Sequence, residues 1–144
     1  MVAGESIENP VSGERITFVR TAADTGGELL ELETTWTKKG MRTPEHVHPE
    51  MEERFEVLSG EARLQIAGEE RSAGPGDVVT VPPGTPHVAW NPADTAAHLR
   101  LEFRPALRWE DFVDRLFALA REDRLEEVPR LMSEFPREVA PPPG

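Results

Sequence analysis

The sequence contains no cysteine and no tyrosine among its 144 residues. Without cysteine, the chain has no disulfide, no thiolate metal ligand and no cysteine nucleophile. Without tyrosine, it has no phenolic hydroxyl group that can act as a catalytic acid or base. The two absences exclude thiol chemistry and tyrosine-dependent proton transfer.

Positive charge is scarce, and long apolar runs are missing. The chain carries 16 Lys and Arg against 27 Asp and Glu, which gives a net charge of -11. Nucleic acids and anionic membrane surfaces bind clustered positive charge, so neither is expected as a partner. No run approaches the roughly eighteen apolar residues of a spanning helix. Residues 1–10 lack the basic and apolar regions of a signal peptide, so a cytoplasmic location is expected.

Between residues 14 and 104, apolar and polar residues alternate in short runs that are separated by turns rich in glycine and proline. A period of two is typical of strands with one buried face. The predicted strands cover residues 14–20, 29–36, 53–58, 62–66, 78–81, 87–90 and 98–104. Many short strands at this spacing predict an all-β sandwich or barrel.

After Pro105 the apolar period changes to that of a helix. The apolar positions are Trp109, Phe112, Val113, Leu116, Phe117 and Ala120. This pattern predicts an amphipathic helix that packs on the outside of the barrel, with a lid or a subunit contact as the alternative. A shorter helical piece is predicted near residues 129–135. We therefore assign residues 1–104 to the barrel, 105–136 to a helical extension and 137–144 to a disordered tail.

His46 and His48 are two residues apart, so an extended backbone places both imidazoles on the same side. Glu53 follows five residues later, with room for a turn that brings its carboxylate back to the pair. The alternation after His87 points that imidazole inward as well. Three imidazoles and one carboxylate would form a divalent transition-metal site, although ordinary surface histidines remain possible from these residues alone. His98 falls on the opposite side of its strand and is predicted to be a surface residue.

Ten positions resemble, in order and spacing, the two sequence motifs of the cupin superfamily. The first motif comprises Gly40, His46, His48, Glu53 and Gly60, and the second comprises Gly76, Pro82, Gly84, His87 and Asn91. The resemblance implies a single jelly-roll barrel of two antiparallel sheets, with residues 40–91 as the motif core. It also implies that His46, His48, Glu53 and His87 bind one divalent metal per chain, which could be Mn, Fe, Ni, Co, Cu or Zn. Asn91 is expected to be a turn residue and not a ligand.

An ion that prefers five or six ligands would bind the four protein ligands and keep one or two coordination positions for a small oxygen ligand. Proteins with similar motifs include dioxygenases, sugar-phosphate isomerases, lyases and metal-binding proteins without a known reaction. The absence of tyrosine and cysteine disfavours the epimerases, several lyases and the thiol dioxygenases of the superfamily. We expect an oxygenase-like enzyme for a small oxygen-chelating substrate, with Glu53 as the catalytic proton acceptor. A non-catalytic small-molecule or metal-binding protein and a non-redox metal-dependent isomerase are the alternatives.

Three apolar side chains, Leu58, Val88 and Trp90, alternate onto the outer face of the predicted barrel. Exposed apolar patches usually mark contacts between proteins. The pattern therefore predicts a homodimer, unless the C-terminal helix covers this surface within one chain.

Overall fold

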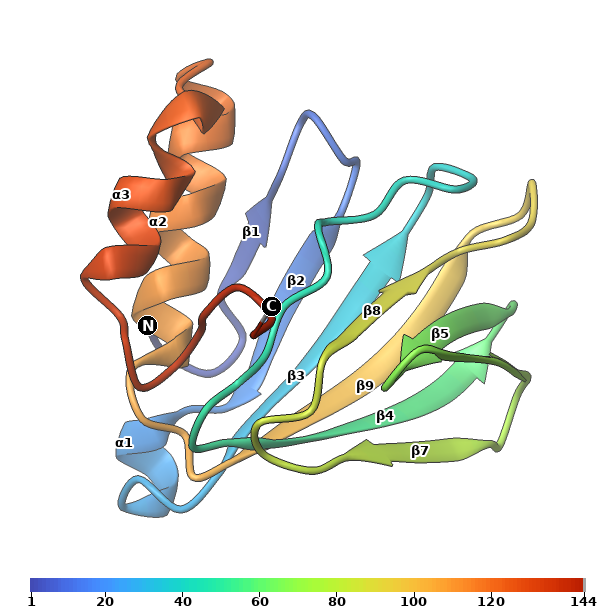
Figure 1. Ribbon diagram of the computed structural model, residues 1–144, viewed down its shortest axis with the longest axis horizontal. Coiled ribbons are helices and arrows are strands. Elements are labelled where there is room, and N and C mark those ends of the chain that lie inside the picture. Colours follow the sequence, from blue (N-terminus) through green and yellow to red (C-terminus); the bar gives the residue numbers. More distant parts are fainter. Residues whose placement is uncertain (144) are drawn as a thin grey trace.

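The computed structural model describes residues 1–143 and consists of two antiparallel sheets with helices at one end (Figure 1). The large sheet has the strand order β1-β2-β3-β9-β4-β7, and the small sheet has the order β6-β5-β8. The strands are β1 (Ser6–Glu8), β2 (Arg15–Arg20), β3 (Leu30–Trp36), β4 (Glu52–Ser59), β5 (Ala62–Ile66), β6 (Glu69–Ala73), β7 (Val78–Val81), β8 (His87–Trp90) and β9 (Ala97–Arg104). The helices are α1 (Ala22–Thr25), α2 (Trp109–Arg121), the 3-10 turn η1 (Leu125–Glu127) and α3 (Val128–Ser133). The predicted jelly-roll fold is confirmed.

The core lies between the sheets. It is built from every second residue along the central strands, whose side chains face inward. Leu32 of β3 stands opposite Leu101 of β9, which in turn stands opposite Phe55 of β4. Leu64 of β5 faces them from the small sheet and is completely buried. Burying a side chain of this size stabilises the fold by about 1.5–3 kcal/mol, so the alternation itself specifies which face of each strand turns inward.

Two strands were not predicted, and both lie at sheet edges. The residues of β6 are exposed except for the last, Ala73, and β1 has only Ile7 partly buried. Edge strands are held by backbone pairing along one side, so they need no apolar alternation. Neither segment therefore carried a signal in the sequence.

The outer face of β8 differs from the prediction. Val88 and Trp90 point away from the barrel interior, yet they are only 4% and 7% exposed. The loop before β4 covers this face, and the guanidinium carbon of Arg42 lies 3.8 Å from the Trp90 ring centroid. Leu58 is half-buried. The apolar surface from which we expected a homodimer is thus covered within one chain, and the homodimer stays a prediction.

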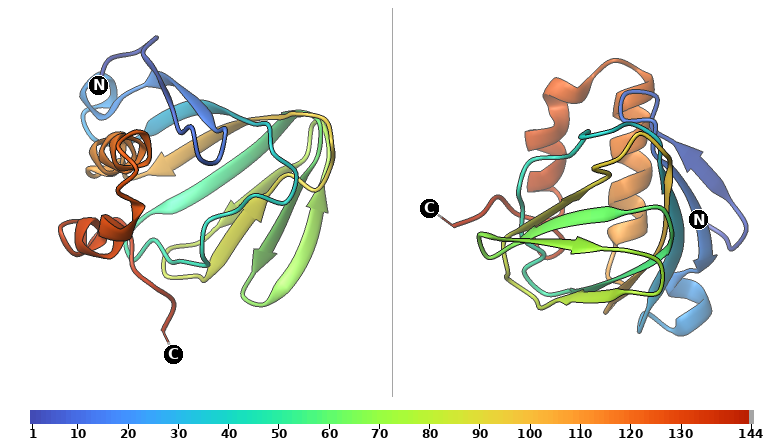
Figure 2. Two further views of the ribbon diagram at one scale, coloured as in Figure 1. Left: turned by 90° about the horizontal axis from the view of Figure 1, so that it is seen from above. Right: turned by 90° about the vertical axis from the view of Figure 1, so that its right-hand side faces the viewer.

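The helices α2 and α3 lie side by side at one end of the sheets (Figures 1 and 2). Phe112 of α2 packs against Phe135, which follows α3, with ring centroids 5.4 Å apart. No helix within residues 1–143 has the length and apolar character needed to cross a membrane.

The segment after the helices runs back to the barrel. Glu138 and Val139 are 1% and 5% exposed, and Ala140 pairs with Val47 through backbone hydrogen bonds of 2.9 and 3.0 Å. This differs from the disordered tail that we expected over residues 137–144, of which Gly144 lies outside the described residues. The pairing partner is distant in the sequence, so no local pattern could indicate the ordered path.

The turn between β4 and β5 requires glycine at position 60. Gly60 has a φ of 78°, and a Cβ atom there would lie 2.5 Å from the carbonyl oxygen of Ala96 and 2.9 Å from Cα of Ala97. We predict that Gly60→Ala lowers the free energy of unfolding by about 2 kcal/mol, through backbone strain and this close approach. Urea unfolding measures the loss. The control is Gly68→Ala, which has a φ of 83° but no atom within 4 Å of the added Cβ; it should cost about 1 kcal/mol, from strain alone. Equal losses in the two variants would contradict the close approach as the cause.

Candidate metal centre

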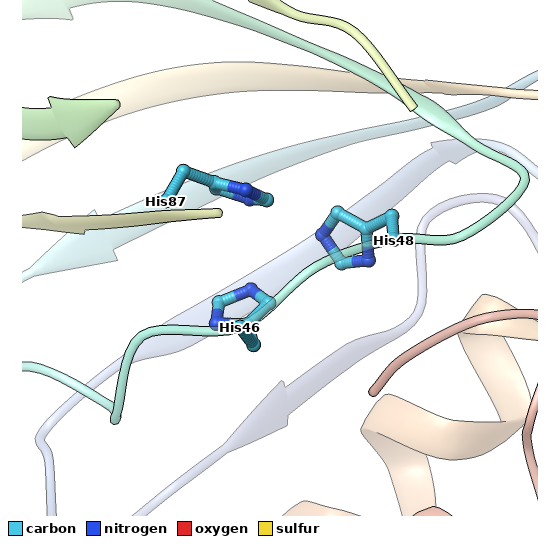
Figure 3. A group of neighbouring side chains, drawn as sticks. All are labelled: His46, His48 and His87. Carbon is cyan, nitrogen blue, oxygen red and sulfur yellow. The ribbon is translucent and has the colours of Figure 1, made fainter. Parts of the chain in front are cut away.

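Three histidines from two segments turn their rings toward one another (Figure 3). His46 and His48 lie just before β4, and His87 begins β8. His46 and His87 pair through reciprocal backbone hydrogen bonds of 3.1 and 2.9 Å. One ring nitrogen of each histidine lies within 4.8 Å of the others, so this set can hold a metal ion. The structure brings together the histidines that the sequence indicated, and it leaves His98 exposed on β9, as predicted.

The Nδ1 atom of each of the three imidazoles faces a backbone carbonyl oxygen. The distances are 3.0 Å from His46 to Pro44, 2.8 Å from His48 to Glu138 and 2.9 Å from His87 to Thr85. A carbonyl oxygen can only accept, so Nδ1 carries the proton in each ring and Nε2 carries the lone pair in the neutral imidazole. Metal-binding histidines in proteins are oriented by hydrogen bonds of this kind. The arrangement therefore fits a metal bound through three Nε2 atoms.

Glu53, at the start of β4, adds a carboxylate to the three rings. Its Oε1 lies 2.9 Å from Nε2 of His48 and 3.1 Å from Nε2 of His87. Burial acts to raise the pKa of Glu53, but its contacts with the two Nε2 atoms outweigh burial and lower the pKa to about 2. A hydrogen bond to Oε1 needs a proton on Nε2, and a metal ion bound at that nitrogen would take the place of this proton. The carboxyl group is therefore ionised at neutral pH, as a metal ligand must be.

Desolvation and the charges of His48 and His87 lower the pKa of His46 to about 4, so this ring is neutral and able to coordinate at neutral pH. Burial acts to lower the pKa of His87, but Glu53 reverses the effect and raises it. A metal ion would therefore compete with a proton for His87.

Two other motif residues hold the backbone around the site. Gly84, with a φ of 74°, donates its N–H to the carbonyl oxygen of His48 at 2.8 Å. Asn91 is completely buried, and its Nδ2 donates to the carbonyl oxygens of Trp36 and Thr95 at 3.0 and 2.8 Å. Its role is structural, in agreement with the sequence prediction.

The helical extension forms one wall of the centre, a contact that the sequence did not reveal. The ring of Trp109, the first residue of α2, meets the His48 ring edge-on with centroids 4.7 Å apart. Phe103 approaches His48 at 5.8 Å, and Phe112 stacks on Trp109 at 5.0 Å. The aromatic stripe was interpreted as packing on the barrel. It also covers His48 with apolar surface.

Comparison with protein families supports the same interpretation. The sequence profile described as "Cupin domain" matches residues 33–103. The chain belongs to the cupin superfamily. No curated protein matches the sequence of this cupin.

Solved structures also resemble this cupin. An RmlC-like cupin from Shewanella frigidimarina is 27% identical with a TM-score of 0.60, over 74% of this chain and 86% of that one. An oxalate oxidase is 24% identical with a TM-score of 0.56, over 73% and 56%. A sugar phosphate isomerase of the cupin superfamily from Silicibacter pomeroyi is 20% identical with a TM-score of 0.57, over 69% and 70%. At these low identities, the oxidase and the isomerase show the shared fold alone.

The carbonyl oxygen of Glu138 orients His48, so the segment that carries it should support metal binding. We predict that a chain ending after Arg137 binds zinc about 10–100-fold more weakly, because His48 loses the acceptor for its Nδ1 proton. The control is a chain ending after Ala140, which keeps this acceptor and the pairing with Val47. Competition with a chelating dye measures the affinity, and circular dichroism confirms folding. Equal affinities for the two folded chains would contradict the assigned role.

Proposed function

We propose that this cupin is a metal-dependent, oxygenase-like enzyme that acts on a small organic substrate chelating through oxygen. His46, His48, His87 and Glu53 would be the metal ligands. The observation that carries the proposal is the set of three Nδ1 hydrogen bonds to carbonyl oxygens, which leaves three Nε2 atoms and one ionised carboxylate facing a common region. A bound redox-active ion would supply Lewis acidity toward the substrate oxygen and electron transfer with dioxygen.

The substrate would approach from the side of His46. This residue is only half-buried, whereas His48 and His87 are each 2% exposed. On the far side of His48, the apolar rings of Phe103 and Trp109 exclude water, which strengthens electrostatic interactions at the site.

Glu53 would accept a proton from the substrate if it loosens from the metal. While it is hydrogen-bonded to His48 and His87, its pKa of about 2 makes it a weak base. When these contacts loosen, burial of the carboxylate raises its pKa, because desolvation disfavours the charged form. The basicity of Glu53 would then rise as it turns toward the substrate.

The test is dioxygen consumption with flavonols, diketones and catechol-like compounds, using protein reconstituted with each candidate metal. We predict uptake with redox-active metals and none with zinc, which has no accessible redox chemistry. In protein that retains its metal, Glu53→Gln should lower the rate by about 100-fold or more if Glu53 is the proton acceptor. His98→Ala is the control, because this exposed histidine lies outside the centre.

Each alternative has its own outcome. Conversion that proceeds equally well with zinc and without dioxygen would contradict the oxygenase and identify a non-redox isomerase or hydrolase. Binding without conversion under any metal would identify a non-catalytic binding protein. The cytoplasmic location and the homodimer stay predictions.

A further inference from the structure

A second carboxyl group lies inside the barrel, on the side of the large sheet. Glu14 precedes β2 and shares the inward side of that strand with Ile16 and Phe18, which are 4% and 1% exposed. Its Oε2 accepts hydrogen bonds from Oγ1 of Thr34 at 2.6 Å and from Nε1 of Trp36 at 3.1 Å. Both partners come from β3. The carboxyl group is thus fixed by one oxygen on the inner face of the sheet.

The other oxygen of Glu14 is open. Within residues 1–143, no hydrogen bond or ion pair reaches Oε1. Within residues 1–143, the buried side-chain nitrogen and oxygen atoms that lack a hydrogen-bond partner are Arg100 Nε and Glu138 Oε1. Oε1 of Glu14 also lacks a partner but is not one of these buried atoms, so solvent reaches it. A carboxyl group that is held along one edge and bare along the other can bind a ligand without losing its own support.

Glu14 and Glu53 share the barrel interior. Burial raises the pKa of Glu14 and the negative charge of Glu53 raises it further, against the hydrogen bonds from Thr34 and Trp36. Within the described residues, no Lys or Arg side chain pairs with either carboxylate. A metal would compensate the charge of Glu53, but Glu14 has no comparable partner. The hydrogen bonds from Thr34 and Trp36 reach Oε2 alone, so Oε1 can still accept a hydrogen bond from a donor on a ligand.

We propose that Glu14 is a second binding position of the site and receives a hydrogen-bond donor, a hydroxyl or ammonium group, on the substrate whose oxygen atoms are held at the histidine centre. The inference rests on the proposed function, because it takes the histidine centre as the position of the chelating oxygen. It narrows the substrate class to oxygen chelators with a polar, donor-bearing tail. Thr34 and Trp36 act as positioning residues, since they hold Glu14 Oε2 and leave Oε1 for the ligand.

The test uses zinc-loaded protein, in which the ligand is bound without redox turnover. The probes are three α-hydroxy acids with the same chelating head and an unbranched tail that ends in a methyl, a hydroxyl or an ammonium group, prepared in several tail lengths. Isothermal titration calorimetry gives each Kd. At the tail length that reaches Glu14, we expect a donor-ended acid to bind about tenfold more tightly than the methyl-ended acid, which is typical for a hydrogen bond to a charged group.

Two variants identify the residue and the kind of donor. In Glu14→Leu, the preference for donor-ended acids should disappear while the methyl-ended acid binds as before. Glu14→Gln keeps an acceptor oxygen but has no charge, so it should lose the preference for the ammonium-ended acid. A preference for the hydroxyl-ended acid that remains in this variant would indicate that the natural donor is neutral. Glu33→Gln is the matched control, because Glu33 lies on β3 with the opposite alternation and should leave all preferences unchanged.

The outcomes separate this inference from the function on which it rests. Equal binding of the three acids at every tail length would overturn the role of Glu14 and leave the chelating site intact. Loss of zinc from Glu14→Gln would also overturn it, because Glu14 would then serve the metal centre itself. Protein that retains zinc but binds none of the acids would overturn the proposed function, and this inference with it.

Discussion

The backbone pairing of His46 with His87 is the contact on which the candidate metal centre depends. Its two hydrogen bonds, of 3.1 and 2.9 Å, join the segment before β4 to the first residue of β8 and bring the two rings to 4.6 Å. The carbonyl group two residues before each histidine then accepts the Nδ1 proton of that ring. One pairing thus sets the distance between two imidazoles, and the local chain sets their tautomers. The position of His48 is then determined as well, because side chains two residues apart on an extended segment lie on the same side.

The helical extension is part of the site as well as of the core. Trp109 covers His48, and the segment after α3 supplies the carbonyl oxygen that orients the same ring. The Glu138 carboxylate accepts a hydrogen bond from the backbone N–H of Arg108 at 3.1 Å, which ties this segment to the start of α2. His48 is therefore held by residues that follow the family motifs in the sequence. Changes in the helices should alter the candidate metal centre without changing any of its three histidines.

Much of this architecture was predictable from the sequence because burial imposes a period of two on each central strand, and the same period placed the histidines. What failed depended on contacts between distant segments. Trp90 was predicted to be exposed, but the loop that carries Arg42 covers it. Ala140 was assigned to a disordered tail, but it pairs with Val47. Glu14 was not singled out because a glutamate at the start of a strand is usually solvated; its shared side with Ile16 was the signal that could have found it.

We propose that three imidazoles and one carboxylate form a single metal site. The most direct measurement is elemental analysis of protein expressed in metal-supplemented medium, together with His46→Ala, His87→Ala and His98→Ala. We predict about one divalent ion per chain in the unaltered protein and in His98→Ala. The ion should be lost from His46→Ala and His87→Ala, because each removes one of the converging nitrogens. Unaltered protein without metal, or loss of metal from His98→Ala alone, would contradict this proposal.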